Sequence, residues 1–385
     1  MKIVFIISGL NTGGAEIMLL RLLARIDRSR FSPHVISLAT LGEIGPHIQA
    51  LDIPVETLGM RARRPNLLAF FQLVRRLNVL KPDIVQTWMY HADLAGGLAA
   101  RITGVSAAVW GIHHSNLDRD KNKLATRMVV YVCAWLSRWL PNRVLICSET
   151  ARQVHVDMGY VEDKMAVVPN GFDLATFRPD PAARLAVRAE LGVEPGTPLV
   201  GLVGRLNPQK NHAGFFEAAS HLYGHLPKVQ FVLVGKGVDE GNHELVRIAE
   251  TAGVRSVTHF LGLRRDIPCL MASLDVLVSS SYGEAFPNVL GEAMACGVPC
   301  VVTDVGDSAY IVGETGCVVP PGDMAGLARA IEKLLVLPAE QRQMLGQRAR
   351  ARVAEHFEIG QVVQRYEAFY EELAKTRQEG SKCAD

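Results

Sequence analysis

The chain has 385 residues, of which 49% are hydrophobic, and this length is too great for one ordinary core, so we expect two domains. Its 41 Lys and Arg residues nearly balance 39 Asp and Glu residues, and the formal net charge of +2 disfavours nucleic acid as a partner. The first apolar run is too short for a signal peptide, and no apolar stretch approaches the roughly 20 residues that span a bilayer. We therefore predict a cytoplasmic protein.

The first half of the chain alternates short apolar runs with longer amphipathic ones. The strand-like runs are Lys2–Ile7, His34–Leu38, Val55–Leu58, Ile84–Thr87, Ala107–Ile112, Val144–Cys147 and Met165–Val168. Helical patterns separate most of them, at Ala15–Ile26, Leu67–Leu80, Leu94–Arg101 and Leu124–Leu140. This alternation predicts a parallel sheet with helices on both faces.

The same plan begins again after the break at Pro179-Asp180-Pro181. Strand-like runs follow at Leu199–Val203, Val229–Val234, Val257–Leu261, Val276–Ser279 and Cys300–Thr303. The helical patterns between and after them are Ala213–Leu222, Glu244–Ala252, Val289–Ala295 and Met324–Leu337. We therefore predict an α/β protein with two doubly wound domains, at residues 1–175 and 176–357.

The seven cysteines form no C-x-x-C pair, and several lie inside apolar runs. We expect buried free thiols in a reducing compartment rather than disulfides. Cys296 and Cys300 lie close in sequence, but no second Cys or His pair is near them, which disfavours a zinc site.

The most informative segment is the polar loop that follows Val276–Ser279. It runs to Pro287, and a helical pattern begins near Asn288. Loop amides and a helix N-terminus together favour anion binding. Glu284 in this loop can accept hydrogen bonds from sugar hydroxyls, and Glu292, about one turn into the helix, can bind a ribose diol. The alternative is that both are helix-end charges on a solvated surface.

Glu284 and Glu292 form an E-x7-E pattern that continues into Ala293–Val301. Other segments match the same family in order: Ser8–Glu16, Val168–Asp173, Val203–Asn211 and Phe260–Gly262. Together they resemble family-four glycosyltransferases of the GT-B fold over nearly the whole chain. The resemblance implies two Rossmann-like domains facing a cleft, with a final helix at about 358–375 that packs back on the N-terminal domain.

The resemblance also implies a site for a nucleotide diphosphate sugar in the C-terminal domain. Arg205 and Lys210 would hold the diphosphate and stabilise charge on the leaving group. Glu284 would bind donor-sugar hydroxyls and Glu292 the ribose. Further donor contacts are implied at Gly13, Gly14, Gly262, Leu263, Phe286, Pro287, Asn288 and Val289. A solvated basic loop is the alternative for the two cations, and a plain tight turn for the Gly13-Gly14 pair.

A histidine doublet, His113-His114, follows the strand-like run Ala107–Ile112. In the family that the chain resembles, a histidine here lies beside the donor sugar. We favour His113, which comes directly after the apolar run, over His114, and a structural hydrogen-bonding role is the alternative for both. The implied catalytic set is His113, Arg205, Lys210 and Glu284.

The acceptor would bind the N-terminal domain in this fold. The candidate acceptor-side residues are Trp88, Tyr90, His91 and His114. The stretch Lys121–Arg143 carries aromatic residues among basic ones, which suits an anionic membrane surface and a lipid-linked acceptor. An ordinary core helix with snorkelling cations is equally consistent with this pattern.

We therefore predict a retaining transferase that moves a hexosyl or N-acetylhexosaminyl group from a nucleotide diphosphate sugar to a glycan or lipid-linked acceptor. Polysaccharide or cell-envelope biosynthesis, with possible peripheral contact at the inner face of the membrane, is the expected setting. Asp118-Arg119-Asp120 spells a D-x-D metal motif of another glycosyltransferase fold, but we predict a solvated turn there, no essential metal and no cofactor.

Two alternatives remain for the function, a GT-B nucleotide-sugar epimerase and a catalytically silent sugar-nucleotide-binding partner. A dehydrogenase is disfavoured because no G-x-G-x-x-G motif follows the first strand-like run.

Overall fold

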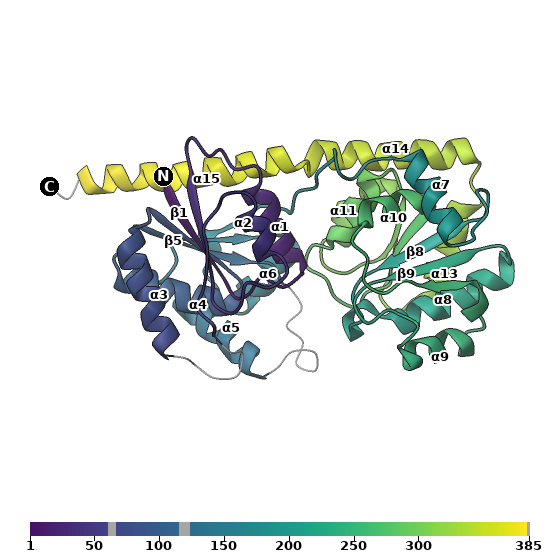
Figure 1. Ribbon diagram of the computed structural model, residues 1–385, viewed down its shortest axis with the longest axis horizontal. Helices are drawn as coiled ribbons and strands as arrows, with labels where there is room; N and C mark the ends of the chain where they lie inside the picture. Colours follow the sequence, from purple (N-terminus) through teal and green to yellow (C-terminus); the bar gives the residue numbers. More distant parts are fainter. Residues whose placement is uncertain (61–66, 115–123, 383–385) are drawn as a thin grey trace. The chain divides into compact units, whose positions relative to one another are not determined.

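The computed structural model describes residues 1–60, 67–114 and 124–382, and the chain forms two compact units (Figure 1). Unit 1 comprises Met1–Gly171 and Ile359–Asp385, and unit 2 comprises Phe172–Glu358. The predicted boundaries at 175/176 and 357/358 lie close to these divisions. Each unit has its own parallel sheet, so the predicted class of two α/β domains is confirmed.

The sheet of unit 1 has seven parallel strands in the order β3-β2-β1-β4-β5-β6-β7. Their bounds are β1 Lys2–Ile7, β2 Ser32–Ser37, β3 Val55–Thr57, β4 Ile84–Trp88, β5 Ala107–Ile112, β6 Arg143–Ile146 and β7 Met165–Val167. Each strand predicted in this half is confirmed, with ends that differ by two residues at most. Short β-branched runs between turn residues made these strands easy to recognise.

Helices cover both faces of this sheet. They are α1 Gly14–Leu23, α2 Gly45–Gln49, α3 Leu67–Leu80, α4 Tyr90–Ile102, α5 Leu124–Leu136, α6 Glu149–Asp157 and α15 Ile359–Lys382, with a short 3-10 helix η1 at Glu162–Lys164. In β1, Phe5 faces a core that α1 and α15 complete, whereas Val4 and Ile6 face a second core with α3 and α4. The strict alternation along β1 is what a strand buried on both faces requires.

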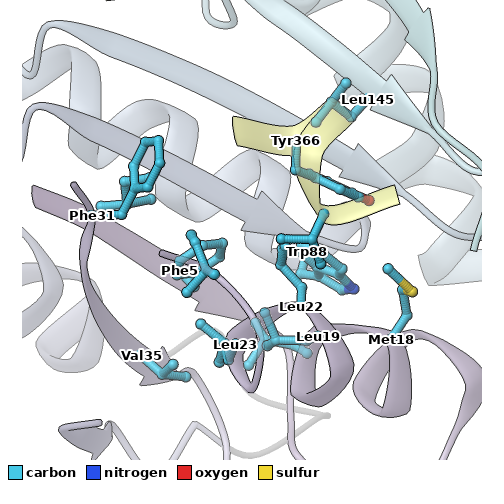
Figure 2. Close-up of a cluster of buried hydrophobic side chains, with 14 of the residues drawn as sticks. Phe5, Met18, Leu19, Leu22, Leu23, Phe31, Val35, Trp88, Leu145 and Tyr366 are labelled. Atoms are coloured by element: carbon cyan, nitrogen blue, oxygen red, sulfur yellow. The ribbon is translucent and has the colours of Figure 1, made fainter. Parts of the chain in front are cut away.

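The last helix belongs to unit 1 although it ends the chain. Tyr366 and Tyr370 of α15 are fully buried in the core that contains Phe5 and Trp88, and Figure 2 shows Tyr366 beside Trp88. The predicted return of the C-terminal helix to the N-terminal domain is therefore present within unit 1. The helix continues to Lys382, beyond the predicted end near residue 375.

The sheet of unit 2 has six parallel strands in the order β10-β9-β8-β11-β12-β13. Their bounds are β8 Leu199–Val203, β9 Gln230–Val234, β10 Thr258–Phe260, β11 Val276–Ser279, β12 Cys300–Thr303 and β13 Cys317–Val319. The helices are α7 Pro181–Glu190, α8 His212–His225, α9 His243–Thr251, α10 Ile267–Ser273, α11 Asn288–Ala295, α12 Ser308–Val312, α13 Met324–Leu335 and α14 Ala339–His356, with 3-10 helices η2 Pro208–Lys210, η3 Arg255–Val257 and η4 Gly313–Thr315. One layer contains α8, α9 and α13, and the other contains α7, α10, α11 and α14.

Both sheets have one point at which the strand order reverses. In unit 1 it lies between β1 and β4, and in unit 2 between β8 and β11. The chain leaves two such neighbouring strands in opposite directions, so ligands of doubly wound sheets bind beyond the carboxyl ends of these strands. The loops after β1, β4, β8 and β11 are therefore the first places to look for a site. Across the described ranges 1–60, 67–114 and 124–382, no helix is both long and apolar enough to cross a membrane.

Candidate functional site

The loop after β8 is held against the loop after β9 by backbone hydrogen bonds. The amide of Gly204 donates to Val234 O over 2.8 Å, and the amide of Leu206 donates to Lys236 O over 2.9 Å. A Cβ at Gly235, where φ is +154°, would lie 2.1 Å from the Gly204 carbonyl oxygen. Only glycine fits this close approach, which fixes the course of the loop that carries Arg205.

The predicted residues Lys210 and Glu284 meet in this structure. The ammonium of Lys210, at the end of η2, donates a 2.6 Å hydrogen bond to Glu284 Oε1, and Ser281 Oγ donates to the same oxygen over 2.7 Å. Both side chains are largely shielded from solvent, with 24% of the Lys210 and 12% of the Glu284 side chain exposed. The carboxylate is thus oriented by two donors before any ligand binds.

Three further contacts join the loops that carry these two residues. The Tyr282 amide donates to Gln209 O over 2.7 Å, and Ser280 Oγ donates to Lys210 O and Asn211 O at 3.1 and 3.0 Å. Asn211 has the left-handed φ of +50°, and its side chain caps α8 by accepting from Gly214 N. Asparagine tolerates this backbone conformation, so the chain turns sharply from η2 into α8.

The loop after β12 supports Glu284 from its other side. Thr303 Oγ1 donates to Ser281 O over 2.6 Å, and the Asp307 amide donates to Ala285 O over 3.0 Å. Gly306 has φ +54°, and a Cβ there would lie 2.3 Å from Glu284 O. The loop with Glu284 is therefore fixed between the loops after β8 and β12, which gives the carboxylate a defined position.

Helix α11 begins directly after this loop. Pro287 is its N-cap residue, and among the described residues no side chain caps its N-terminus. The Leu290 amide donates to Pro287 O over 3.1 Å, and the N-terminus of this helix is of the kind that favours an anion. Glu292, in the second turn, is buried, whereas Arg205 is exposed in the loop after β8.

Three further predicted donor contacts of unit 2 are Phe286, Gly262 and Leu263. The Phe286 ring is buried and packs 6.3 Å from the Phe172 ring, so only its backbone is placed to contact a ligand. Gly262 has φ +61° and joins the loops after β9 and β10, since its amide donates to Val238 O and its carbonyl accepts from Gly235 N. Leu263 follows with an exposed side chain beyond the carboxyl end of β10.

In unit 1, Gly13 is the N-cap residue of α1, and Gly14 is the first residue of the helix. The backbone of Gly13 is extended, with φ −164°, so its conformation does not demand glycine. A Cβ there would lie 2.4 Å from Glu16 Oε2, but this is the end of a flexible side chain that can move aside, so the position does not require glycine. The glycine pair thus brings the backbone close to the Glu16 carboxylate at the start of α1.

His113 lies flat against Trp88 at the carboxyl ends of β5 and β4. The ring centroids are 4.6 Å apart with 15° between the planes, and the His113 ring is hydrogen-bonded to the Asn170 side chain. Burial lowers the pKa of His113 to about 3, so the imidazole is neutral at physiological pH. Its Nδ1 is buried and has no hydrogen-bond partner among the residues that the structure describes.

Two of the predicted acceptor-side residues have buried side chains. Trp88 is fully buried and donates from Nε1 to Ala15 O, and Tyr90 is buried with its hydroxyl 2.9 Å from His155 Nε2. The acceptor-side role of these two residues stays a prediction. The two side chains pack behind His113 and His114. The Tyr90 hydroxyl donates to His114 O over 3.3 Å. The side chain of His91 is exposed.

Asp93, which was not predicted from the sequence, organises the turn between β4 and α4. Its buried Oδ1 accepts from Thr87 Oγ1 over 2.6 Å and from Gly111 N over 3.3 Å, and burial raises its pKa to about 7. Met89, in the same turn, has φ +78°, and its amide donates to Gly111 O. A non-glycine residue in this conformation stores about 1–3 kcal/mol of strain, which is common beside functional sites.

The sequence also led to predictions about metal binding. The D-x-D segment Asp118–Asp120 lies outside them. Within them, no group of three or more His, Cys, Asp or Glu residues is arranged to hold a metal ion. The metal requirement of the protein stays a prediction.

Comparisons with known proteins agree with this geometry. Residues 197–336 match the family described as Glycosyl transferases group 1, and residues 12–176 match Glycosyltransferase Family 4. Together these matches cover most of both units. The first contains the loops of Lys210 and Glu284, and the second contains His113 and Asn170.

Individual proteins similar to this chain are also glycosyltransferases. A 2-deoxystreptamine glucosyltransferase of Streptomyces kanamyceticus is 30% identical over 268 residues, which are 66% of this chain and 67% of that protein. The UDP-Gal:alpha-D-GlcNAc-diphosphoundecaprenol alpha-1,3-galactosyltransferase of Escherichia coli is 28% identical over 278 residues, 70% of each chain. The crystal structure of Anabaena HepE in complex with UDP-glucose superposes with a TM-score of 0.82 and 25% identity over 98% of this chain and 100% of that one.

The family matches, the relatives and the two parallel-sheet units agree. The chain belongs to the group 1, family 4 glycosyltransferases of the GT-B fold.

Proposed function

We propose that the chain transfers a hexosyl or N-acetylhexosaminyl group from a nucleotide diphosphate sugar to a glycan or lipid-linked acceptor, with retention of anomeric configuration. The observation that carries this proposal is the Lys210–Glu284 pair at the reversal point of the unit 2 sheet, directly before the uncapped N-terminus of α11. A cation, an oriented carboxylate and a helix N-terminus are the groups that a sugar diphosphate needs.

Each group has a defined chemical task in this proposal. The α11 amides, Lys210 and Arg205 bind the diphosphate and stabilise the charge that develops on it as the glycosidic bond breaks. Glu284 accepts hydrogen bonds from sugar hydroxyls, and the buried Glu292 accepts them from the ribose. Gly262 and Leu263 border the base.

The proton of the acceptor hydroxyl needs a base other than His113. An imidazole with a pKa of about 3 is too weak a base to remove this proton efficiently at neutral pH. We propose that an oxygen of the departing diphosphate accepts the proton on the face where the bond breaks, which gives retention. His113 then acts as a neutral hydrogen-bonding group beside the sugar.

The names of the relatives favour a UDP-sugar as the first donor to test. HepE is described in complex with UDP-glucose, and the Escherichia coli relative uses UDP-galactose with a diphosphoundecaprenol-linked acceptor. These names describe transferases, which favours transfer over the epimerase and silent-partner alternatives. We further propose polysaccharide or cell-envelope biosynthesis at the cytoplasmic face of the membrane, without a metal or cofactor.

Product analysis tests this function. Purified chain is incubated with UDP-glucose, UDP-galactose or UDP-N-acetylglucosamine, with a panel of glycan and undecaprenyl diphosphate-linked acceptors and with EDTA present. We expect one pair to yield a glycoside whose anomeric proton coupling in NMR matches that of the donor. An inverted product would contradict retention, and a donor isomerised without acceptor would establish the epimerase.

A further inference from the structure

Unit 1 gathers exposed apolar side chains on one helical layer. Of the 18 large hydrophobic side chains that are exposed across the described chain, ten come from α3, α4, α5 and the turn after α5. We call this set the α3–α5 face; it consists of Leu67, Leu68, Phe71, Val79, Ile102, Met128, Tyr131, Val132, Trp135 and Trp139. So many apolar groups on one side exceed the scattered exposure that is normal for a soluble surface.

The helices of this face form one continuous layer. Helix α4 packs against α3 on one side and against α5 on the other. Figure 1 shows all three on the side of the unit 1 sheet away from α1 and α15. The Trp135 and Trp139 rings meet edge to face with centroids 4.9 Å apart, so they present one aromatic pair to solvent.

The charge of this layer has a single sign over long stretches. Between residues 124 and 148 the sequence has no Asp or Glu, but it contains Arg127, Arg138 and Arg143. Between residues 67 and 82 it again has no carboxylate, and it contains Arg75, Lys81 and Arg76, of which Arg76 is paired with Glu56 of β3. Aromatic and aliphatic groups mixed with cations are the composition of a surface that binds anionic lipids.

A cavity of about 280 Å³ opens where this layer meets the amino ends of β5 and β6. Its lining includes two cations, Arg101 and Lys164, and no carboxylate, together with Ser106, Asn142 and the exposed Trp139. The Lys164 ammonium donates to the carbonyls of Ser137, Arg138 and Pro141, which fixes its charge in the wall. Asn142 Oδ1 accepts from Ala108 N, which orients its amide nitrogen as a donor.

We propose that the α3–α5 face docks on an anionic membrane and that the Arg101–Lys164 cavity receives a lipid phosphate. The apolar ring of Trp139 lies at this cavity, so one element contacts both acyl chains and headgroup, as tryptophan does at membrane interfaces. The cavity lies at the amino ends of the strands, opposite the carboxyl end that carries His113, so headgroup binding leaves that end accessible. The biological role of this docking rests on the proposed transfer to lipid-linked acceptors.

Vesicle cosedimentation of the full chain tests the surface. One set of vesicles is phosphatidylcholine, and the other is equal parts phosphatidylcholine and phosphatidylglycerol. We expect binding to the second set only, and weaker binding as salt is added. Arg101→Glu should lower the binding constant about 30-fold, since each unit of charge near an anionic surface contributes about fivefold and the change is two units.

A double variant, Trp135→Ala with Trp139→Ala, should lower binding by about tenfold or more through the loss of buried apolar area. Arg348→Glu and Met344→Ala, both exposed on α14 in unit 2, are the matched controls and should bind as the unaltered chain does. Thermal shift with UDP-glucose, measured on every variant, separates loss of membrane binding from loss of the donor site or of folding.

Three results would overturn the proposal. The first is equal binding to both kinds of vesicle, or to neither. The second is an Arg101→Glu variant that binds like the Arg348→Glu control. The third is a dimer in vesicle-free solution that the tryptophan double variant converts to monomer, since a second copy would then cover the face.

Discussion

Lys210 and Glu284 form an ion pair with Nζ and Oε1 2.6 Å apart, although 74 positions separate them in the sequence. They meet because β8 and β11, the strands before their loops, are hydrogen-bonded neighbours in the sheet. The Ser281 hydroxyl donates a hydrogen bond to the same carboxylate oxygen. The pair therefore places a cation for phosphate and an acceptor for sugar hydroxyls at one point.

Removal of Lys210 should affect catalysis more than folding. In Lys210→Ala the developing charge on the diphosphate loses a fixed cation, and we expect kcat/KM to fall about 100- to 1,000-fold. Steady-state kinetics on the best donor and acceptor measure this loss. Lys228→Ala, at an exposed position before β9, is the matched control and should keep full activity. A Lys210→Ala variant as active as that control would remove Lys210 from the catalytic set.

The His113 imidazole should stay neutral across the working pH range. Its pKa lies at about 3 because burial disfavours the charged ring. The depressed pKa gives stability that is present above the unfolded pKa near 6.5 and is lost as pH falls toward 3. NMR of labelled histidine, assigned with His113→Gln, should show no His113 titration between pH 5 and 8. A midpoint inside that window would contradict the buried, neutral assignment.

Asp93 should make the stability of unit 1 depend on pH in the direction opposite to that of His113. Its pKa is raised to about 7, so its contribution is present below 3.8 and is lost as pH rises to 7. The upper limit of this loss is about 4 kcal/mol, since one pKa unit corresponds to about 1.4 kcal/mol. Asp93→Asn keeps an acceptor for Thr87 and does not titrate.

Chemical unfolding at pH 5 and pH 8 measures this effect. The free energy of unfolding of Asp93→Asn relative to the unaltered chain should increase between the two values. Asp83→Asn, which removes an exposed carboxylate that is hydrogen-bonded to the Lys2 amide at the amino end of β1, is the control. A relative stability of Asp93→Asn that does not change with pH would show that the buried carboxyl is ionised throughout.

Helix α15 should be required for the stability of unit 1. Tyr370 is fully buried against Phe5 and Phe31, with ring centroids at 6.5 and 6.1 Å. Tyr370→Ala removes a large core side chain, and we expect a loss of about 3–5 kcal/mol. Calorimetry should show a lower unfolding temperature for unit 1, while the unfolding temperature of unit 2 stays unchanged. Met344→Ala on the exposed surface of α14 should move neither.

The sequence predicted strands better than it predicted helices. Helix α14 went unrecognised because its described core contacts come from small residues, including Gly346 and Ala349, in an otherwise polar segment. Strand β13 has three residues, too few to show a period of two. A long run of large apolar residues gives a clear hydrophobic periodicity in the sequence, whereas an element with small or few core residues gives almost none.

The site was predictable as a set of loops but not as a set of contacts. The order of the motifs indicated that Lys210 and Glu284 belong to one site, and sheet topology explains why they meet. The burial of the Trp88 and Tyr90 side chains was not encoded in a local pattern, because their partners, Ala15 O and His155 Nε2, lie far away in the sequence. Asn170 belonged to a recognised motif, but its contact with His113 depends on distant strands. A lone Asp93 among Ala and Gly residues was the one signal overlooked.

The most direct test of the account is isothermal titration of UDP-glucose, UDP-galactose and UDP-N-acetylglucosamine into the full chain with EDTA, beside Glu292→Gln and the exposed control Glu250→Gln. We expect one donor to bind without metal. We also expect Glu292→Gln to weaken binding of that donor about 10- to 100-fold, because a charge-assisted hydrogen bond to the ribose is lost, while Glu250→Gln has no effect. Unchanged donor affinity in Glu292→Gln, or binding only after a divalent metal is restored, would contradict the account.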